Sequence, residues 1–263
     1  MKPFALLLAL VGVWLTGVNP NSQAQTTTPS DQQGTAAQAR RSTEENNAGH
    51  FGAGIKVSSL GLGAEAAVLL SHRSNLRVGF NVLGWSHTFT KDGIPYSGHL
   101  NFKTFEAHYD FFPWAGNFHV SPGILIYVAD PIKASAFVAG DRSFTLGGVR
   151  FYSDPSSPAT ATGKINFNRA APTITVGWGN LISRKEGSRF SFPFEVGIAF
   201  QGSPKTSLGF GGNVCTSPGM NCTPAATNPE VQRNIASEEN KINRNVSFLK
   251  VYPIISSGFA VRF

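Results

Sequence analysis

Acidic and histidine side chains recur at every second position in one short segment of the chain. Glu106, His108 and Asp110 are spaced by two residues, and side chains at that spacing share one face of a β-strand. An acid–histidine pair on one face could transfer a proton, and the same three groups could bind a metal ion. The sequence offers no nucleophile beside them, and mixed ligands at strand spacing are a weak signal for a metal. We therefore expect no catalytic residue, no metal and no cofactor.

Serine and histidine side chains elsewhere raise the possibility of nucleophilic catalysis. Ser86 and His87 are adjacent, so on a strand they point to opposite faces and cannot act together as nucleophile and base. His99, His119 and Ser97 are single residues whose partners the sequence does not identify. An isolated histidine among polar groups is usually a member of a hydrogen-bond network. We expect the protein not to be an enzyme.

A larger set of polar side chains alternates with apolar ones, and this set needs strands to position it. Glu195 lies between Phe194 and Val196, in a segment where Phe and other apolar residues occupy every second position from Phe190 to Phe200. Buried charges must be paired, so we expect the polar face to form a salt-bridge network. The residues expected on this face are Lys56, Glu65, Arg77, Lys103, Glu106, His108, Asp110, Glu195, Lys250 and Arg262.

The last strand shows the same alternation up to the final residue. Phe263, Val261 and Phe259 fall on one face, and Arg262, Ala260 and Gly258 fall on the other. An apolar face toward lipid and a small or polar face toward a lumen is the pattern of a transmembrane β-barrel. This segment resembles the closing strand of bacterial outer-membrane barrels, in which the terminal aromatic residue is read by the barrel-assembly machinery. The resemblance implies that Phe263, Val261 and Phe259 form the assembly signal.

The N-terminal segment indicates export. A basic start at Lys2, an apolar run from Phe4 to Leu15 and small residues up to Ala24 predict a signal peptide over 1–24, cleaved before Gln25. Residues 25–49 lack hydrophobic periodicity and are expected to form a disordered periplasmic lead-in. The domain predicted for 50–263 is the barrel. Only 14% of the residues are charged, against about a quarter in soluble domains.

We expect eight antiparallel strands, because an even number returns both ends of the barrel to the periplasm. The predicted strands cover 51–58, 62–70, 76–90, 98–112, 118–126, 163–179, 190–201 and 246–263. A change of phase in the fourth strand suggests a β-bulge near Thr104. The segments 130–162 and 202–245 are expected to be long outer loops, and Glu230–Asn243 within the second has the composition of a short helix.

The motifs Gly177-Trp178-Gly179-Asn180, Phe200 to Lys205 and Tyr252-Pro253 resemble a group of outer-membrane barrel proteins for which no activity is agreed. More broadly, the chain from Phe51 to Phe263 resembles the small barrels of the opacity-protein and OmpA-membrane-domain type. This resemblance is architectural and implies no chemistry. In an exported chain, Cys215 and Cys222 are expected to form a disulfide.

These observations predict a bacterial outer-membrane β-barrel with a structural or surface-interaction role and a lumen filled by side chains. The alternatives are a narrow, porin-like channel for small solutes and, less favoured, a barrel enzyme acting on outer-membrane lipid or peptide. The expected partners are outer-membrane lipid, lipopolysaccharide and, during biogenesis, the barrel-assembly machinery. We expect the protein to be a monomer. We also expect that it does not bind nucleic acid, because the basic residues are scattered singly.

Overall fold

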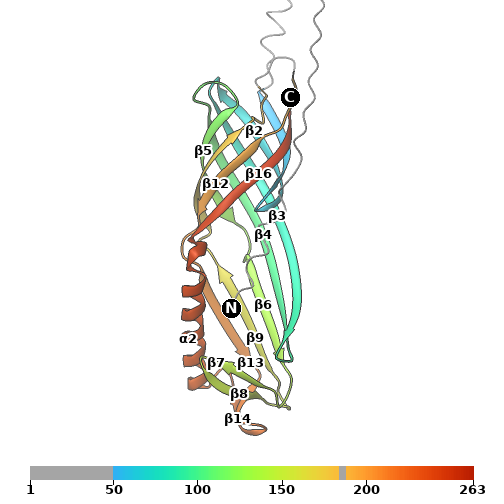
Figure 1. Ribbon diagram of the computed structural model, residues 1–263, viewed down its shortest axis with the longest axis vertical. Coiled ribbons are helices and arrows are strands. Elements are labelled where there is room, and N and C mark those ends of the chain that lie inside the picture. The colour runs from blue at the N-terminus through green and yellow to red at the C-terminus, as the bar shows by residue number, and fades with distance from the viewer. Residues whose placement is uncertain (1–49, 184–187) are drawn as a thin grey trace, which may run out of the picture. The chain divides into compact units, whose positions relative to one another are not determined.

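The computed structural model describes residues 50–183 and 188–263. The predicted signal peptide and periplasmic lead-in lie outside these ranges. The described chain contains a closed barrel, an open sheet that continues from it, and a small second sheet with one α-helix (Figure 1).

Eight antiparallel strands close the barrel, as predicted. Neighbouring strands follow the order β4-β3-β2-β1-β16-β12-β10-β5, and β5 pairs back with β4 to complete the ring. These strands are β1 (Phe51–Ser58), β2 (Gly61–Ser71), β3 (Ser74–Lys91), β4 (Ile94–Phe111), β5 (Phe118–Tyr127), β10 (Ala170–Trp178), β12 (Phe194–Phe200) and β16 (Val251–Arg262). The two-residue β11 (Phe190–Ser191) pairs with β16 beside β12. Closure leaves no strand edge within the ring.

β3 and β4 are 18 residues long and extend well beyond the barrel. They are joined by a tight turn in which Asp92 and Gly93 both have positive φ angles, 52° and 72°. Two positive φ angles are what a type I′ hairpin turn requires. Beyond the barrel, β4 exchanges its neighbour β5 for β6 (Ile132–Val138), and β9 (Ala159–Asn166) and β13 (Lys205–Gly211) follow in the sheet. We call the part of this sheet from β3 residue 83 to β13 the outer sheet.

The two segments predicted to be long loops are therefore largely strands, and that prediction was wrong. Residues 130–162 contain β6, β7 (Ser143–Leu146), β8 (Val149–Ser153) and the start of β9. Residues 202–245 contain β13, β14 (Asn213–Ser217), β15 (Met220–Pro224) and the helix α2 (Pro229–Asn245). The predicted sixth strand is also divided, because β9 belongs to the outer sheet and β10 to the barrel. The short helix was predicted correctly.

One face of the outer sheet packs on α2 and the small sheet formed by β7, β8, β14 and β15. Val231 and Ile235 of α2 are buried there together with residues of both sheets. The buried members of this core are Ile94, Val138, Leu146, Phe151, Ala159, Val214, Ala225, Val231 and Ile235. Cys215 and Cys222 lie opposite each other on β14 and β15 and form the predicted disulfide. The outer sheet thus has its own apolar core, separate from the barrel.

Side chains of α2 cover the edge of the outer sheet at β13. The side chain of Asn228 caps the helix by accepting hydrogen bonds from the amides of Glu230 and Val231. Further along α2, Glu239 Oε1 accepts from the Leu208 amide at 2.7 Å, and Asn243 Oδ1 accepts from the Thr206 amide at 2.8 Å. An uncovered edge strand would present these amides for pairing with another chain. No helix in the described ranges is both long and apolar enough to cross a membrane.

We predict that Glu239→Ala exposes this edge. The substitution removes a charge-assisted hydrogen bond, so the Leu208 amide should exchange its hydrogen about tenfold faster or more. The measurement is amide hydrogen exchange of the folded protein, with Glu238→Ala as the matched control. Glu238 lies on the same helix, and its one ion pair within the described chain is with Lys241, at 3.4 Å. Equal protection of Leu208 in both variants would contradict the role assigned to Glu239.

Candidate functional site in the barrel lumen

Arg77 on β3 is the centre of a buried ion network inside the barrel. Its side chain is only 2% exposed and contacts carboxylates from three other strands. Nη1 lies 3.1 Å from Glu65 Oε2 on β2, and Nη2 lies 2.9 Å from Asp110 Oδ1 on β4. Glu195 on β12 completes the set, with its Oε1 at 2.5 Å from Nη2. The planar guanidinium group can satisfy several carboxylates at once because its five N–H donors point in fixed directions.

Lys56 on β1 forms the second cationic point of the network. Its Nζ lies 3.2 Å from Glu65 Oε2 and also contacts Glu106 Oε1. Glu106 in turn faces His108 at 3.6 Å on the same strand. Glu65 therefore bridges Lys56 and Arg77, which joins the two cations into one network.

Two residues of β5 complete the network from the opposite side. Ser121 Oγ donates to Asp110 Oδ1 at 2.6 Å, and His119 Nε2 lies 2.9 Å from Glu195 Oε1. His119, Asp110 and Glu195 are close enough to one another to hold a metal ion. In this structure, however, both carboxylates already bind the Arg77 guanidinium group. The three residues are thus used in the ion network and offer no open ligand position.

The described part of the network contains four carboxylates, two permanent cations and two histidines. The carboxylates of Glu65, Glu106, Asp110 and Glu195 outnumber Lys56 and Arg77. Charges buried in this way are costly unless each is paired and hydrogen-bonded. The arrangement pairs the carboxylates with the cations, so that the charges neutralise one another.

Apolar layers lie at the two ends of the lumen. Toward the outer sheet, a buried cluster of Leu60, Phe102, Leu125, Tyr127, Ala171, Ala199 and Ile254 occupies the interior. At the other end, Ala67, Leu181, Ile182 and Ala260 form a smaller cluster. Leu125 is fully buried and Phe102 is 5% exposed. The interior of an eight-stranded barrel is just wide enough for side chains to fill it, and here it is filled in three successive layers.

The segment after β10 folds into the barrel at the end where β1 begins and β16 ends. Asn180 fixes it there: its Oδ1 accepts from Asn75 Nδ2 at 2.6 Å and from the Ile182 amide at 3.0 Å. Its backbone oxygen accepts from Ser191 Oγ at 2.5 Å. Gly179, with φ of 99°, makes the bend that starts this segment. These contacts place Leu181 and Ile182 in the apolar cluster at this end.

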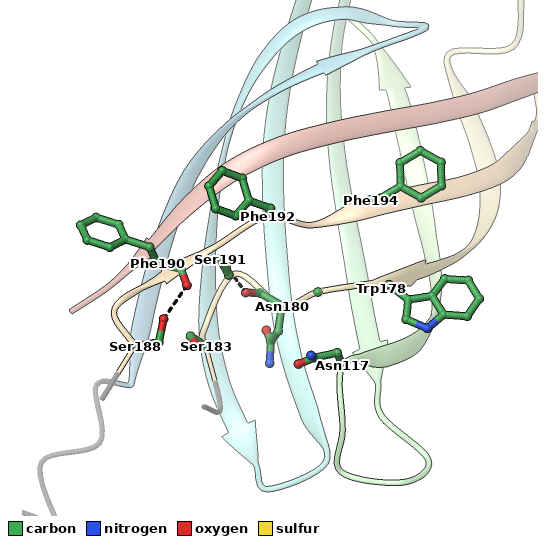
Figure 2. A pocket seen from close by; sticks show the side chains of 10 residues that line it. Asn117, Trp178, Asn180, Ser183, Ser188, Phe190, Ser191, Phe192 and Phe194 are labelled. Atoms are coloured by element: carbon green, nitrogen blue, oxygen red, sulfur yellow. Dashed lines mark hydrogen bonds between the residues drawn. The ribbon is translucent and has the colours of Figure 1, made fainter. Parts of the chain in front are cut away.

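A cavity of about 320 Å³ lies beside this segment (Figure 2). Asn117, Asn180 and Ser183 line its polar side, and aromatic rings line the other. Asn180 Nδ2 is buried and has no hydrogen-bond partner among the described residues. The aromatic residues are Trp178, Phe190, Phe192 and Phe194. Three residues of the Gly177-to-Asn180 motif line this cavity. The sequence analysis used the motif only as part of a family resemblance and did not predict a cavity.

The structure brings together seven of the ten residues expected in the network, and three lie elsewhere. Lys103 points outward and is exposed, because no bulge occurs at Thr104: the β3–β4 register is continuous from Ser74 to Lys91. The phase of β4 changes because Phe102 points inward to the apolar layer. Lys250 is exposed at the end of the 3-10 helix η1 (Ser247–Lys250). Arg262 donates to the Ser183 backbone oxygen at 2.7 Å and takes no part in the ion network.

Sequence reasoning named His119 and Asn180 but did not place them, or Ser121, among the inward-facing residues. His119 and Ser121 could have been found, because they alternate with the outward-facing Phe118, Val120 and Pro122. Asn180 lies outside any strand, and no periodic signal marks it.

The sequence also missed that Ser86 pairs with His99 across β3 and β4, where Ser86 Oγ lies 2.9 Å from His99 Nδ1. This pair is exposed on the outer sheet. No described carboxylate forms an ion pair or hydrogen bond with His99, so the orienting third group of a catalytic triad is missing.

Among proteins of known structure, the chain resembles CarO and CarO2 of Acinetobacter baumannii. With CarO it shares 19% identity over 81% of this chain and 97% of that chain, at a TM-score of 0.46. With CarO2 it shares 20% identity over 81% of this chain and 98% of that chain, at a TM-score of 0.48. Similarity at this level carries no argument about function. No family model matches the chain, and no curated protein matches it. The resemblance to the opacity-protein and OmpA-membrane-domain type stays a prediction.

We predict that Arg77→Met destabilises the barrel strongly. Removal of the guanidinium group leaves three buried carboxylates without their main partner, which should cost about 3–5 kcal/mol of unfolding free energy. Glu195→Gln should cost less, because Arg77 keeps Glu65 and Asp110. The measurement is urea unfolding of the refolded protein, with the exposed Arg169→Met as control. If Arg77→Met were as stable as this control, the network would not hold the barrel together.

Proposed function

We propose that this protein is a bacterial outer-membrane β-barrel whose lumen is filled, and which acts through the outer sheet that it presents beyond the membrane. The placement is supported by the outward face of the barrel, where large apolar side chains are exposed on every wall. Ile55, Val57, Leu62, Val78 and Phe105 are between 51% and 67% exposed. Water-soluble proteins rarely expose contiguous apolar surfaces of this kind. A lipid-facing band on a closed barrel accounts for them.

The connections between strands support one orientation. At the end where β1 begins and β16 ends, β2 and β3 are joined by a two-residue turn, and β4 and β5 by six residues. At the opposite end, the chain builds the outer sheet, the small sheet and α2. Outer-membrane barrels have short periplasmic turns and long extracellular segments. We therefore assign the end with both termini to the periplasm and the outer sheet to the exterior.

The observation that carries the filled-lumen proposal is the Arg77 network between two apolar layers. A solute path would require polar side chains facing a continuous aqueous space. Here the polar side chains bind one another, and one residue of each successive layer, Leu125, Arg77 and Ile182, is at most 2% exposed. A structural or surface-interaction role therefore fits the interior better than the channel alternative.

We expect the purified, refolded protein to be electrically silent in planar bilayers. A refolded porin in the same bilayers shows that conducting barrels are detected. Correct folding of the inserted protein can be checked by its heat-modifiable migration on gels, which is typical of closed barrels. Stable, discrete openings from correctly folded protein would contradict the filled lumen and support the channel.

A second prediction tests the placement. The mature protein should begin near Gln25 and fractionate with the outer membrane. Deletion of Phe263, which is 71% exposed, should lower the outer-membrane yield more than Lys241→Gln in α2, because it removes part of the assembly signal that the resemblance implies. Recovery of the wild-type protein in the soluble periplasm would contradict its proposed location in the outer membrane. Unchanged yield of the deletion variant would contradict only the role of Phe263.

A further inference from the structure

The face of the outer sheet opposite α2 carries basic groups in a single row across its strands. The pairing register places Ser86, His99, Lys133, Lys164 and Ser207 side by side on β3, β4, β6, β9 and β13. Lys133 and Lys164 are therefore directly opposite each other on neighbouring strands. Like charges in that position destabilise a sheet. Their side chains are 49% and 53% exposed, so neither is buried by another element.

Only one carboxylate in the described chain compensates these two lysines. Asp130 Oδ2 lies 3.4 Å from Lys133 Nζ and 3.9 Å from Lys164 Nζ. The shared carboxylate leaves a net positive charge at the row, next to the imidazole ring of His99. Lys103 and Lys205 also point outward on the same side of the sheet, nearer the barrel. The row therefore attracts anions.

A depression of about 370 Å³ lies at one end of this row. Ser86, His99, Asn101 and Lys133 line it with hydroxyl, imidazole, amide and ammonium groups. Gly84 forms part of its wall, and a Cβ atom built at Gly84 would meet nothing within 4 Å. The depression is open because this position has no side chain. It is large enough for a phosphate group and part of a sugar.

The height of the row above the lipid-facing apolar band of the barrel indicates where a bound anion would come from. On the barrel wall below the row, the outward apolar residues end at Val82 and Val128, beside Lys103. On this face of β6, an exposed apolar side chain recurs only beyond the hydroxyl-bearing residues, at Phe137. His99 lies four residues beyond Lys103 on β4, which corresponds to a height of about 10 Å for a strand tilted as in membrane barrels. In the proposed orientation, the phosphates and sugars of the outer leaflet lie at this height.

The next row across the sheet consists of small hydroxyl-bearing residues. Thr88, Ser97, Ser135 and Thr162 lie side by side immediately beyond the basic row, followed by Gly209. Such a flat surface lacks bulky side chains and offers hydrogen bonds to sugar hydroxyl groups. Apolar band, basic row and hydroxyl row thus follow one another in the order of acyl chains, phosphate and sugar.

We propose that this face binds a phosphorylated glycolipid of the outer leaflet, with Lys133 and Lys164 contacting a sugar phosphate and the depression at Gly84 receiving the adjoining group. The proposal rests on the outer-membrane placement proposed above and specifies its glycolipid partner. It commits to a membrane lipid, because the row is continuous with the lipid-facing wall.

The test measures binding of purified lipopolysaccharide to the full protein in detergent, by native mass spectrometry. The double variant Lys133→Gln/Lys164→Gln should bind about thirtyfold more weakly, since each lysine near an anionic lipid surface contributes about 1 kcal/mol. The wild-type protein should bind enzymatically dephosphorylated lipopolysaccharide more weakly than intact lipopolysaccharide, by a similar factor. Lys241→Gln on α2, whose side chain is 61% exposed, is the matched control and should bind normally.

Gly84→Leu tests the depression without removing a charge. The side chain fits sterically, so the variant should fold, as checked by heat-modifiable migration, and bind the glycolipid several-fold more weakly. Wild-type affinity in the double lysine variant, or equal affinity of the wild type for phosphatidylglycerol, would overturn the proposal. Both results concern the purified protein and leave the cell-fractionation test of the placement untouched, so failure of the site and failure of the placement are distinguishable.

Discussion

The pairing of Arg77 with three carboxylates is the interaction on which the rest of the barrel depends. A closed ring satisfies the backbone of every strand but leaves an interior that water cannot easily hydrate and lipid cannot enter. The network joins residues of β1, β2, β3, β4, β5 and β12, so six of the eight barrel strands are linked through one set of charges. Because a buried ion without its partner is costly, this set specifies which strand faces which. The apolar layers above and below add burial but are less selective.

The outer sheet solves a different problem, because an open sheet has two edges. At β13 the edge is covered by α2, whose Glu239 and Asn243 accept hydrogen bonds from the strand amides. At the other edge, β3 pairs with β2 only as far as Val82, and no described strand pairs with this side of β3 from Leu83 to Lys91. The two faces also differ: one holds an apolar core and the other carries lysines and hydroxyl groups. The outer sheet therefore has two distinct edges and two distinct faces, whereas the barrel has the same kind of wall all around.

Alternation along the chain was sufficient to predict the barrel and most of its lumen. Glu65, Arg77, Asp110 and Glu195 were placed inward because their neighbours are apolar and outward-facing. The same rule failed at Lys103, since it assumes a polar interior, whereas the lumen at that level is apolar and Phe102 points in. It also failed in 130–162 and 202–245, where short strands rich in Gly, Ser and Thr look like loops. Their strand character comes from pairing with the extended β4 and from the core under α2, which are non-local contacts that no single segment reveals.

The long hairpin of β3 and β4 has a consequence for how the molecule forms. Its 18 residue pairs follow one two-residue turn without interruption, so each pair closes a loop only slightly larger than the previous one. Closure entropy therefore opposes this hairpin least. The pairing of β1 with β16 joins residues such as Gly52 and Arg262 and must bring together nearly the whole described chain. By this reasoning the hairpin is the natural template for assembly, and the barrel and the outer sheet grow from the two halves of the same pair of strands.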